Sequence, residues 1–194
     1  MGFMTRYYPD GITIVNRGQA SSAGQAVLQQ LYEYVTTMVC VAVNGVPTIG
    51  VIHSPYSGKT TWAWVNRALS EDLMYIKKDE NVTKNPTITI HSGDVKEKAA
   101  KAFGESSNIL IAAGSGYKVL QVVSNNATIY LHTTRIKKWD ICAGNAILNA
   151  VGGRMSTLEN ASIDYSRDLT AVNDKGLLAT LGHHDFYFNK YTSV

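Results

Sequence analysis

Residues 136–153 read IKKWDICAGNAILNAVGG, and this stretch decides how the rest of the chain is interpreted. Apolar residues between 141 and 151 predict a buried helix that ends at Gly152 and Gly153. Asp140 directly precedes this helix, where its carboxylate can accept hydrogen bonds from the free N–H groups of the first turn. A second role is open at the same position. A helix N-terminus favours anions, so a carboxylate there can hold a metal ion beside a phosphate.

Strands and helices alternate on both sides of this stretch from residue 84 onward. Short apolar runs predict strands over 87–90, 108–113, 128–132, 162–165 and 176–181. One helix is predicted from a cap at Asp94 to a stop at Gly104, and another after the Gly-rich turn that follows 108–113. This alternation is typical of a mixed, layered sheet, and residues 84–194 are therefore predicted to form a C-terminal α/β domain.

The segment before residue 84 has a different pattern of predicted elements. VTTMVCVAV (35–43) and VPTIGVIHSP (46–55) are joined by Asn44-Gly45, a strong hairpin signal because both turn residues need a positive φ. A third strand is predicted over 60–65, so residues 35–83 form an antiparallel meander. Residues 1–34 are predicted to be a loosely ordered lead-in with a short helix over 25–34. The fold class is α/β, with the layers of an α+β protein.

Composition excludes several classes of protein. The 194 residues are 45% hydrophobic and 17% charged, which excludes a disordered chain. No apolar run is long enough to span a bilayer. A net charge of +3 is too small to indicate a nucleic-acid binder and suits a small anionic substrate equally well. Cys40 and Cys142 lie in apolar runs and are predicted to be buried thiols rather than a disulfide framework.

Four segments in order carry a family resemblance: 35–45, 50–55, 113–120 (AGSGYKVL) and 136–148. Together they resemble the inositol monophosphatase superfamily, most closely its Golgi-resident branch of 3′-phosphoadenosine 5′-phosphate phosphatases. The resemblance runs from about residue 34 to 181. It implies a layered sandwich and Mg²⁺-dependent hydrolysis of a phosphate monoester. It also implies that Asp140 ligates Mg²⁺ and that Gly114, Lys118 and His91 contact the nucleotide.

Other interpretations of these residues remain open. GSGYK (114–118) is also an ordinary strand-to-helix connection. His91 follows the strand 87–90 directly, without the Ser-Arg-Ser that precedes the equivalent histidine in the family, and a lone histidine there is commonly a surface residue. His132, His183 and His184 have no evident role.

The resemblance also implies metal ligands that the sequence does not contain. The family takes them from a Glu-Glu pair and an Asp-Pro-x-Asp-x-Thr motif ahead of residue 35. Residues 9–13 (PDGIT) mimic this motif only in fragments and are interpreted as a turn, and Glu33 cannot replace four ligands. No catalytic residue is therefore identified. We expect an incomplete family domain whose strands over 35–65 expose an apolar face and an unpaired edge, unless residues 1–34 substitute for the missing layer. Such a domain is expected to be poorly soluble when expressed alone.

Three functions follow. The first is release of the 3′-phosphate from 3′-phosphoadenosine 5′-phosphate to give AMP. The second is hydrolysis of an inositol monophosphate. The third is a non-catalytic role in which the chain binds a nucleotide or a partner protein. A homodimer is a possible assembly. Sequons at Asn81, Asn126 and Asn160 suit the Golgi lumen that the resemblance implies. No targeting signal is recognised, which keeps a cytoplasmic location open.

Overall fold

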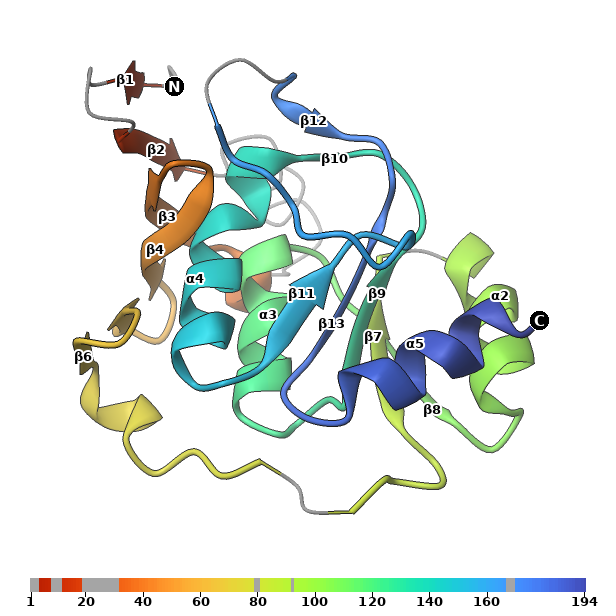
Figure 1. Ribbon diagram of the computed structural model, residues 1–194. Coiled ribbons are helices and arrows are strands. Elements are labelled where there is room, and N and C mark those ends of the chain that lie inside the picture. Colours follow the sequence, from red (N-terminus) through yellow and green to blue (C-terminus); the bar gives the residue numbers. More distant parts are fainter. Residues whose placement is uncertain (1–3, 8–11, 19–31, 79–80, 92, 167–169) are drawn as a thin grey trace.

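The computed structural model describes residues 4–7, 12–18, 32–78, 81–91, 93–166 and 170–194. They form stacked layers (Figure 1): a six-stranded antiparallel sheet, a pair of helices, a five-stranded mixed sheet, and a second pair of helices. We call the two sheets sheet A and sheet B. The layered α/β fold class is confirmed. No helix within the described ranges is both long enough and apolar enough to cross a membrane.

Sheet A is a meander in which each strand pairs with the next. Its strands are β1 (Met4–Tyr7), β2 (Ile12–Gly18), β3 (Thr37–Val43), β4 (Val46–Ser54), β5 (Lys59–Trp64) and β6 (Ala68–Leu69). Asn44 and Gly45 have φ values of 50° and 77°, as the predicted hairpin turn requires. β1 and β2 lie in the segment expected to be a loosely ordered lead-in. Of the helix expected over 25–34, residues 25–31 lie outside the described residues, and Tyr32–Tyr34 form the single turn η1.

Two expectations concern sheet A, namely an unpaired edge and an exposed apolar face, and the structure bears out the second one. β2 pairs with β3 along its whole length, so the edge expected to be free at β3 is paired. The outer face is partly exposed, as expected. Val39, Val51 and Trp62 lie opposite one another on β3, β4 and β5, and Trp62 and Trp64 are 36% and 46% exposed.

Sheet B has the strand order β11-β13-β9-β7-β8. β7 (Thr87–Ile90) lies parallel to both β8 (Asn108–Ile111) and β9 (Ile129–His132), while β11 (Arg154–Ser156) and β13 (Leu177–Thr180) are antiparallel additions. A two-stranded ribbon joins β10 (Ile136–Lys137) to β12 (Val172–Asn173). The strand predicted over 162–165 is reduced to one bridge between Ser156 and Ser162, and the sequence did not predict β11 or the C-terminal helix α5 (His184–Thr192).

Two hydrophobic cores lie between the layers. Between the sheets, α3 (Ser115–Val123) and α4 (Cys142–Ala150) bury Val119, Val122, Ile147 and Leu148 against Met38 and Ile52 of sheet A and Tyr130 of sheet B. On the other face of sheet B, α2 (Gly93–Phe103) and α5 bury Val95, Phe103 and Tyr187 against Ile88 and Ile90. Gly104, with a φ of 98°, ends α2 at the predicted residue.

The two cysteines correct a prediction. Both are buried as expected, but they form a disulfide between β3 and the first residue of α4, with Cα atoms 5.8 Å apart. The prediction of free thiols is wrong, because 102 residues separate the cysteines in sequence and only the packing of α4 on sheet A makes them neighbours.

Candidate substrate-binding site

The candidate site lies at the carboxyl edge of the parallel part of sheet B. His91 follows β7, and residues 112–114 follow the adjacent parallel strand β8. The chain leaves β7 toward α2 on one face of the sheet and leaves β8 toward α3 on the other. The two loops therefore diverge at the point where parallel α/β sheets form a ligand-binding crevice.

Gly114 and Lys118 lie after β8 at this edge of sheet B. Gly114 precedes α3 with a φ of 68°, a conformation that glycine adopts without strain. Lys118 is buried, and its Nζ donates hydrogen bonds to the carbonyl oxygens of Ala112 (3.1 Å) and Gly114 (3.0 Å). Burial lowers the pKa of Lys118 to about 8, so the ammonium remains mostly protonated near neutral pH. It thus fixes the turn and places a positive charge behind it.

Two histidines lie at the same edge of sheet B, after β7 and at the end of β9. The rings of His91 and His132 have centroids 6.0 Å apart, and His132 is the last residue of β9, on the same edge. Burial, with a smaller contribution from Lys118, lowers the pKa of His91. Burial lowers the pKa of His132 to about 4. Both imidazoles are therefore mainly neutral at pH 7. Sequence analysis assigned no role to His132, since its place beside His91 depends on the pairing of β7 with β9.

Asp140 lies next to the N-terminus of α3. It ends the single turn η3 (Lys138–Asp140), and its backbone oxygen accepts a 2.5 Å hydrogen bond from Ser115 Oγ. The residue that directly precedes α4 is Ile141 rather than Asp140, so the helix begins one residue later than predicted. α3 and α4 contact each other, and this hydrogen bond joins the start of α3 to the turn that leads into α4. The two helix starts therefore lie close together, and the positive end of a helix dipole favours an anion.

Residues 22–190 match the model of the inositol monophosphatase family. The chain belongs to this family. It is 55% identical over 166 residues to putative inositol monophosphatase 3 of Drosophila melanogaster, covering 84% of this chain and 47% of that protein. It is 46% identical over 153 residues to human Golgi-resident adenosine 3′,5′-bisphosphate 3′-phosphatase, covering 74% of this chain and 42% of that protein. The chain thus spans just under half the length of these relatives.

Solved structures support the fold. Inositol monophosphatase II of Staphylococcus aureus superposes with a TM-score of 0.76 at 18% identity, over 95% of this chain and 68% of that one. An inositol monophosphatase/NADP phosphatase complexed with Mg²⁺ and phosphate gives a TM-score of 0.69 at 14% identity, over 87% of this chain and 62% of that one. At these identities the likeness establishes the family's layered fold.

The described residues do not complete a magnesium site. Mg²⁺ prefers about six oxygen ligands in octahedral geometry. Within the described ranges, no three His, Cys, Asp or Glu side chains gather closely enough to hold a metal. Asp140, the expected ligand, ends η3 beside the start of α3, whereas Glu33 lines a cavity of about 320 Å³ beside the same helix.

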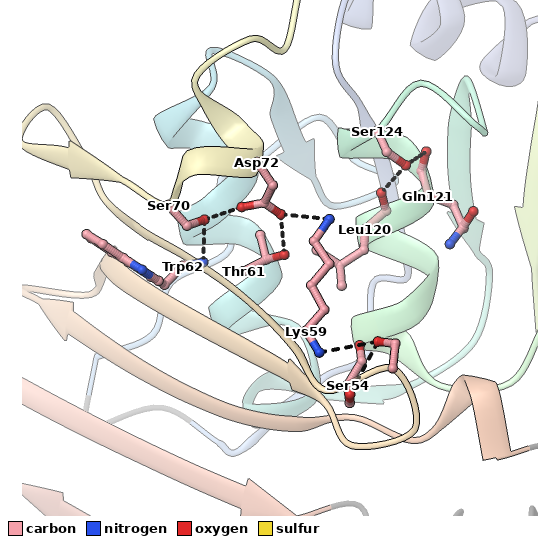
Figure 2. Close-up of polar contacts among 10 residues, drawn as sticks. Ser54, Lys59, Thr61, Trp62, Ser70, Asp72, Leu120, Gln121 and Ser124 are labelled. Carbon is pink, nitrogen blue, oxygen red and sulfur yellow. Dashed lines mark hydrogen bonds and ion pairs between the residues drawn. The ribbon is translucent and has the colours of Figure 1, made fainter.

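That cavity contains a polar cluster that the sequence did not predict (Figure 2). The carboxylate of Asp72, in η2 (Glu71–Leu73), accepts hydrogen bonds from Thr61 Oγ1 (2.6 Å) and Ser70 Oγ (2.5 Å) and pairs with Lys59 Nζ (3.0 Å). Burial alone would raise the pKa of Asp72, but the hydrogen bonds from Ser70, Thr61 and Lys59 outweigh it and the pKa is lowered. Because every partner belongs to β5 or the residues around it, the cluster joins η2 to sheet A.

Proposed function

We propose that this chain provides the substrate-binding part of a Mg²⁺-dependent phosphomonoesterase. The observation that carries the proposal is the hydrogen bond that Ser115 Oγ donates to the backbone oxygen of Asp140. It joins residues 114–118, which are expected to contact the nucleotide, to the expected metal ligand. The positive ends of the helix dipoles of α3 and α4 and the ammonium of Lys118 supply positive potential to bind a phosphate. Mg²⁺, when bound, would polarise the phosphate ester.

The proposed substrate is 3′-phosphoadenosine 5′-phosphate, which would yield AMP and phosphate. A neutral imidazole at His91 can exchange hydrogen bonds with a base or ribose without adding charge at this edge of the sheet. The human relative's name, adenosine 3′,5′-bisphosphate 3′-phosphatase, supports the same substrate.

An inositol monophosphate is the second candidate substrate. The names of the fly and Xenopus laevis relatives, at 55% and 48% identity, favour it. A non-catalytic role in binding a nucleotide or a partner, including a second copy of this chain, is the third candidate. It is favoured because Asp140 is the single expected metal ligand that the sequence contains.

We also propose a Golgi or secretory location. The human relative is Golgi-resident by name, and the sequon asparagines Asn81, Asn126 and Asn160 are all exposed and open to glycosylation. A disulfide is also typical of an oxidising compartment.

A phosphate-release assay tests the function. The purified chain is incubated with Mg²⁺ and either the bisphosphate nucleotide or inositol 1-phosphate, and Asp140→Asn is compared with Asp174→Asn, an exposed carboxylate in a loop. We expect release from the nucleotide that Asp140→Asn abolishes and Asp174→Asn leaves unchanged. Release that survives Asp140→Asn would contradict the assignment. AMP binding by calorimetry without any release would favour the non-catalytic role.

A further inference from the structure

The disulfide lies at the start of the helix that follows Asp140. Cys142 is the first residue of α4, two residues after Asp140, and its partner Cys40 lies in the middle of β3. Both cysteines are buried, at 0% and 2% exposure. The bond therefore connects sheet A directly to the turn of chain that presents the expected metal ligand.

The N-cap residue does not stabilise this helix start through its side chain. It is Ile141, whose apolar side chain makes no capping hydrogen bond. Helix ends without a cap fray readily. A covalent link at the first residue opposes such opening, because it keeps Cys142 at β3 even when the turn's hydrogen bonds break.

Packing around the first turn leaves little room for another arrangement. Gly50 of β4 lies so close to the Ala143 carbonyl that a Cβ at this position would clash with it. On the opposite side, a Cβ on Gly144 would lie 2.5 Å from Val119 Cγ1 of α3. Sheet A and α3 thus enclose the turn, and the disulfide fixes its position along the sheet.

We propose that the Cys40–Cys142 disulfide is a positioning element that holds the η3–α4 turn, and with it Asp140, in place against sheet A. The role of Asp140 rests on the proposed function, whereas the link and its effect on the turn do not. In its formation the two thiols lose two electrons and two protons to the disulfide of a thiol oxidoreductase, which becomes a dithiol.

The first test is chemical. Peptide mapping of the chain made in an oxidising compartment, without reductant, is expected to find the peptides of Cys40 and Cys142 joined. Finding both cysteines alkylated in the native, folded chain would overturn the proposal. This measurement requires no variant and no metal.

The second test measures the turn itself by hydrogen–deuterium exchange of a peptide spanning residues 138–146. In Cys40→Ala/Cys142→Ala we expect exchange in this peptide to be faster by about tenfold or more, while the β7 and β9 peptides change far less. Ile147→Val, a loss of one buried methylene from the same helix, is the control and is expected to change all core peptides to a similar, smaller extent.

Equal changes in the 138–146 peptide and the β7 and β9 peptides would show that the bond stabilises the fold only generally and would overturn the positioning role. Should the double alanine variant not fold, Cys40→Val/Cys142→Ala restores core volume for the same comparison. Exchange is measured without Mg²⁺ or substrate. An inactive chain that shows the local effect would therefore contradict only the proposed function.

Discussion

At the scale of single residues, the structure changes the interpretation of Lys118 most. Sequence analysis expected it to contact a nucleotide, but its Nζ is held by the carbonyl oxygens of Ala112 and Gly114 beneath the turn. Its contribution to binding would therefore come from its charge and from the shape it gives the turn.

Lys118→Met is expected to destabilise the chain by about 1–3 kcal/mol, because it leaves two carbonyl oxygens without their donor in a buried place. Urea unfolding measures this free energy. Lys101→Met, at an exposed position of α2, is the control and is expected to change stability by less than about 0.5 kcal/mol. Equal effects of the two substitutions would contradict the structural role of Lys118.

At the scale of elements, the strands and helices with clear patterns were predicted correctly. β3, β4, β7 and β13 are apolar runs bounded by turn residues, and the Asn44-Gly45 hairpin needs no distant contact to form. β11 and β12 have three and two residues and carry no pattern of their own, so pairing with distant strands defines them. α5 was missed because its sequence, HDFYFNKYT, has no clear apolar stripe.

The contact between α3 and α4 depends on a glycine, which gives a prediction at this scale. Gly144→Ala is expected to cost about 1–3 kcal/mol, because its Cβ would overlap Val119. In the Val119→Ala background the same substitution should cost clearly less, since the overlapping methyl groups are gone. Unfolding free energies of the four chains give the coupling, and purely additive effects would contradict the proposed overlap.

The Asp72 cluster joins η2 to sheet A and gives a second prediction. Asp72→Ala is expected to cost about 1–3 kcal/mol, because it leaves the buried Thr61 hydroxyl without its acceptor. Its lowered pKa means that this stabilisation is present above the usual aspartate pKa of 3.8 and is lost as pH falls through the lower folded value. Thermal unfolding at pH 7 and pH 3 measures both effects. Glu71→Ala, an exposed carboxylate of the same turn, should show neither.

At the scale of the whole molecule, buried neutral histidines make stability depend on pH. His132 and His184 both have a pKa lowered to about 4, mainly by burial, and His184 contacts Ser156 Oγ (2.9 Å) and Thr180 Oγ1 (3.1 Å). Between pH 6.5 and pH 4 the unfolded chain binds protons that the folded chain excludes, so stability falls as the pH falls.

Each histidine is expected to remove at most about 3 kcal/mol over this window, with no further loss from them above pH 6.5. Chemical unfolding at a series of pH values measures the slope. His184→Gln should reduce it by about half, and an unchanged slope in this variant would show that other groups cause the acid sensitivity.

We expect the outer face of sheet A to govern the chain's tendency to associate. Trp62→Thr/Trp64→Thr removes two exposed tryptophans of this face and replaces them with a residue that favours strands. We expect less self-association by sedimentation at equal concentration. Tyr75→Thr removes an exposed aromatic from a loop and is the control; association that falls equally in both variants would contradict a role for this face.

The sequence by itself determined the family, the layered α/β class, the central hairpin and the stretch that contains Asp140, since these depend on local pattern and on motifs in order. Only the tertiary structure decided what surrounds them. It placed His132 beside His91, turned Lys118 inward, paired β2 with β3 and joined Cys40 to Cys142. The physical reason is that each of these contacts is made between layers or strands, at distances that no local periodicity encodes.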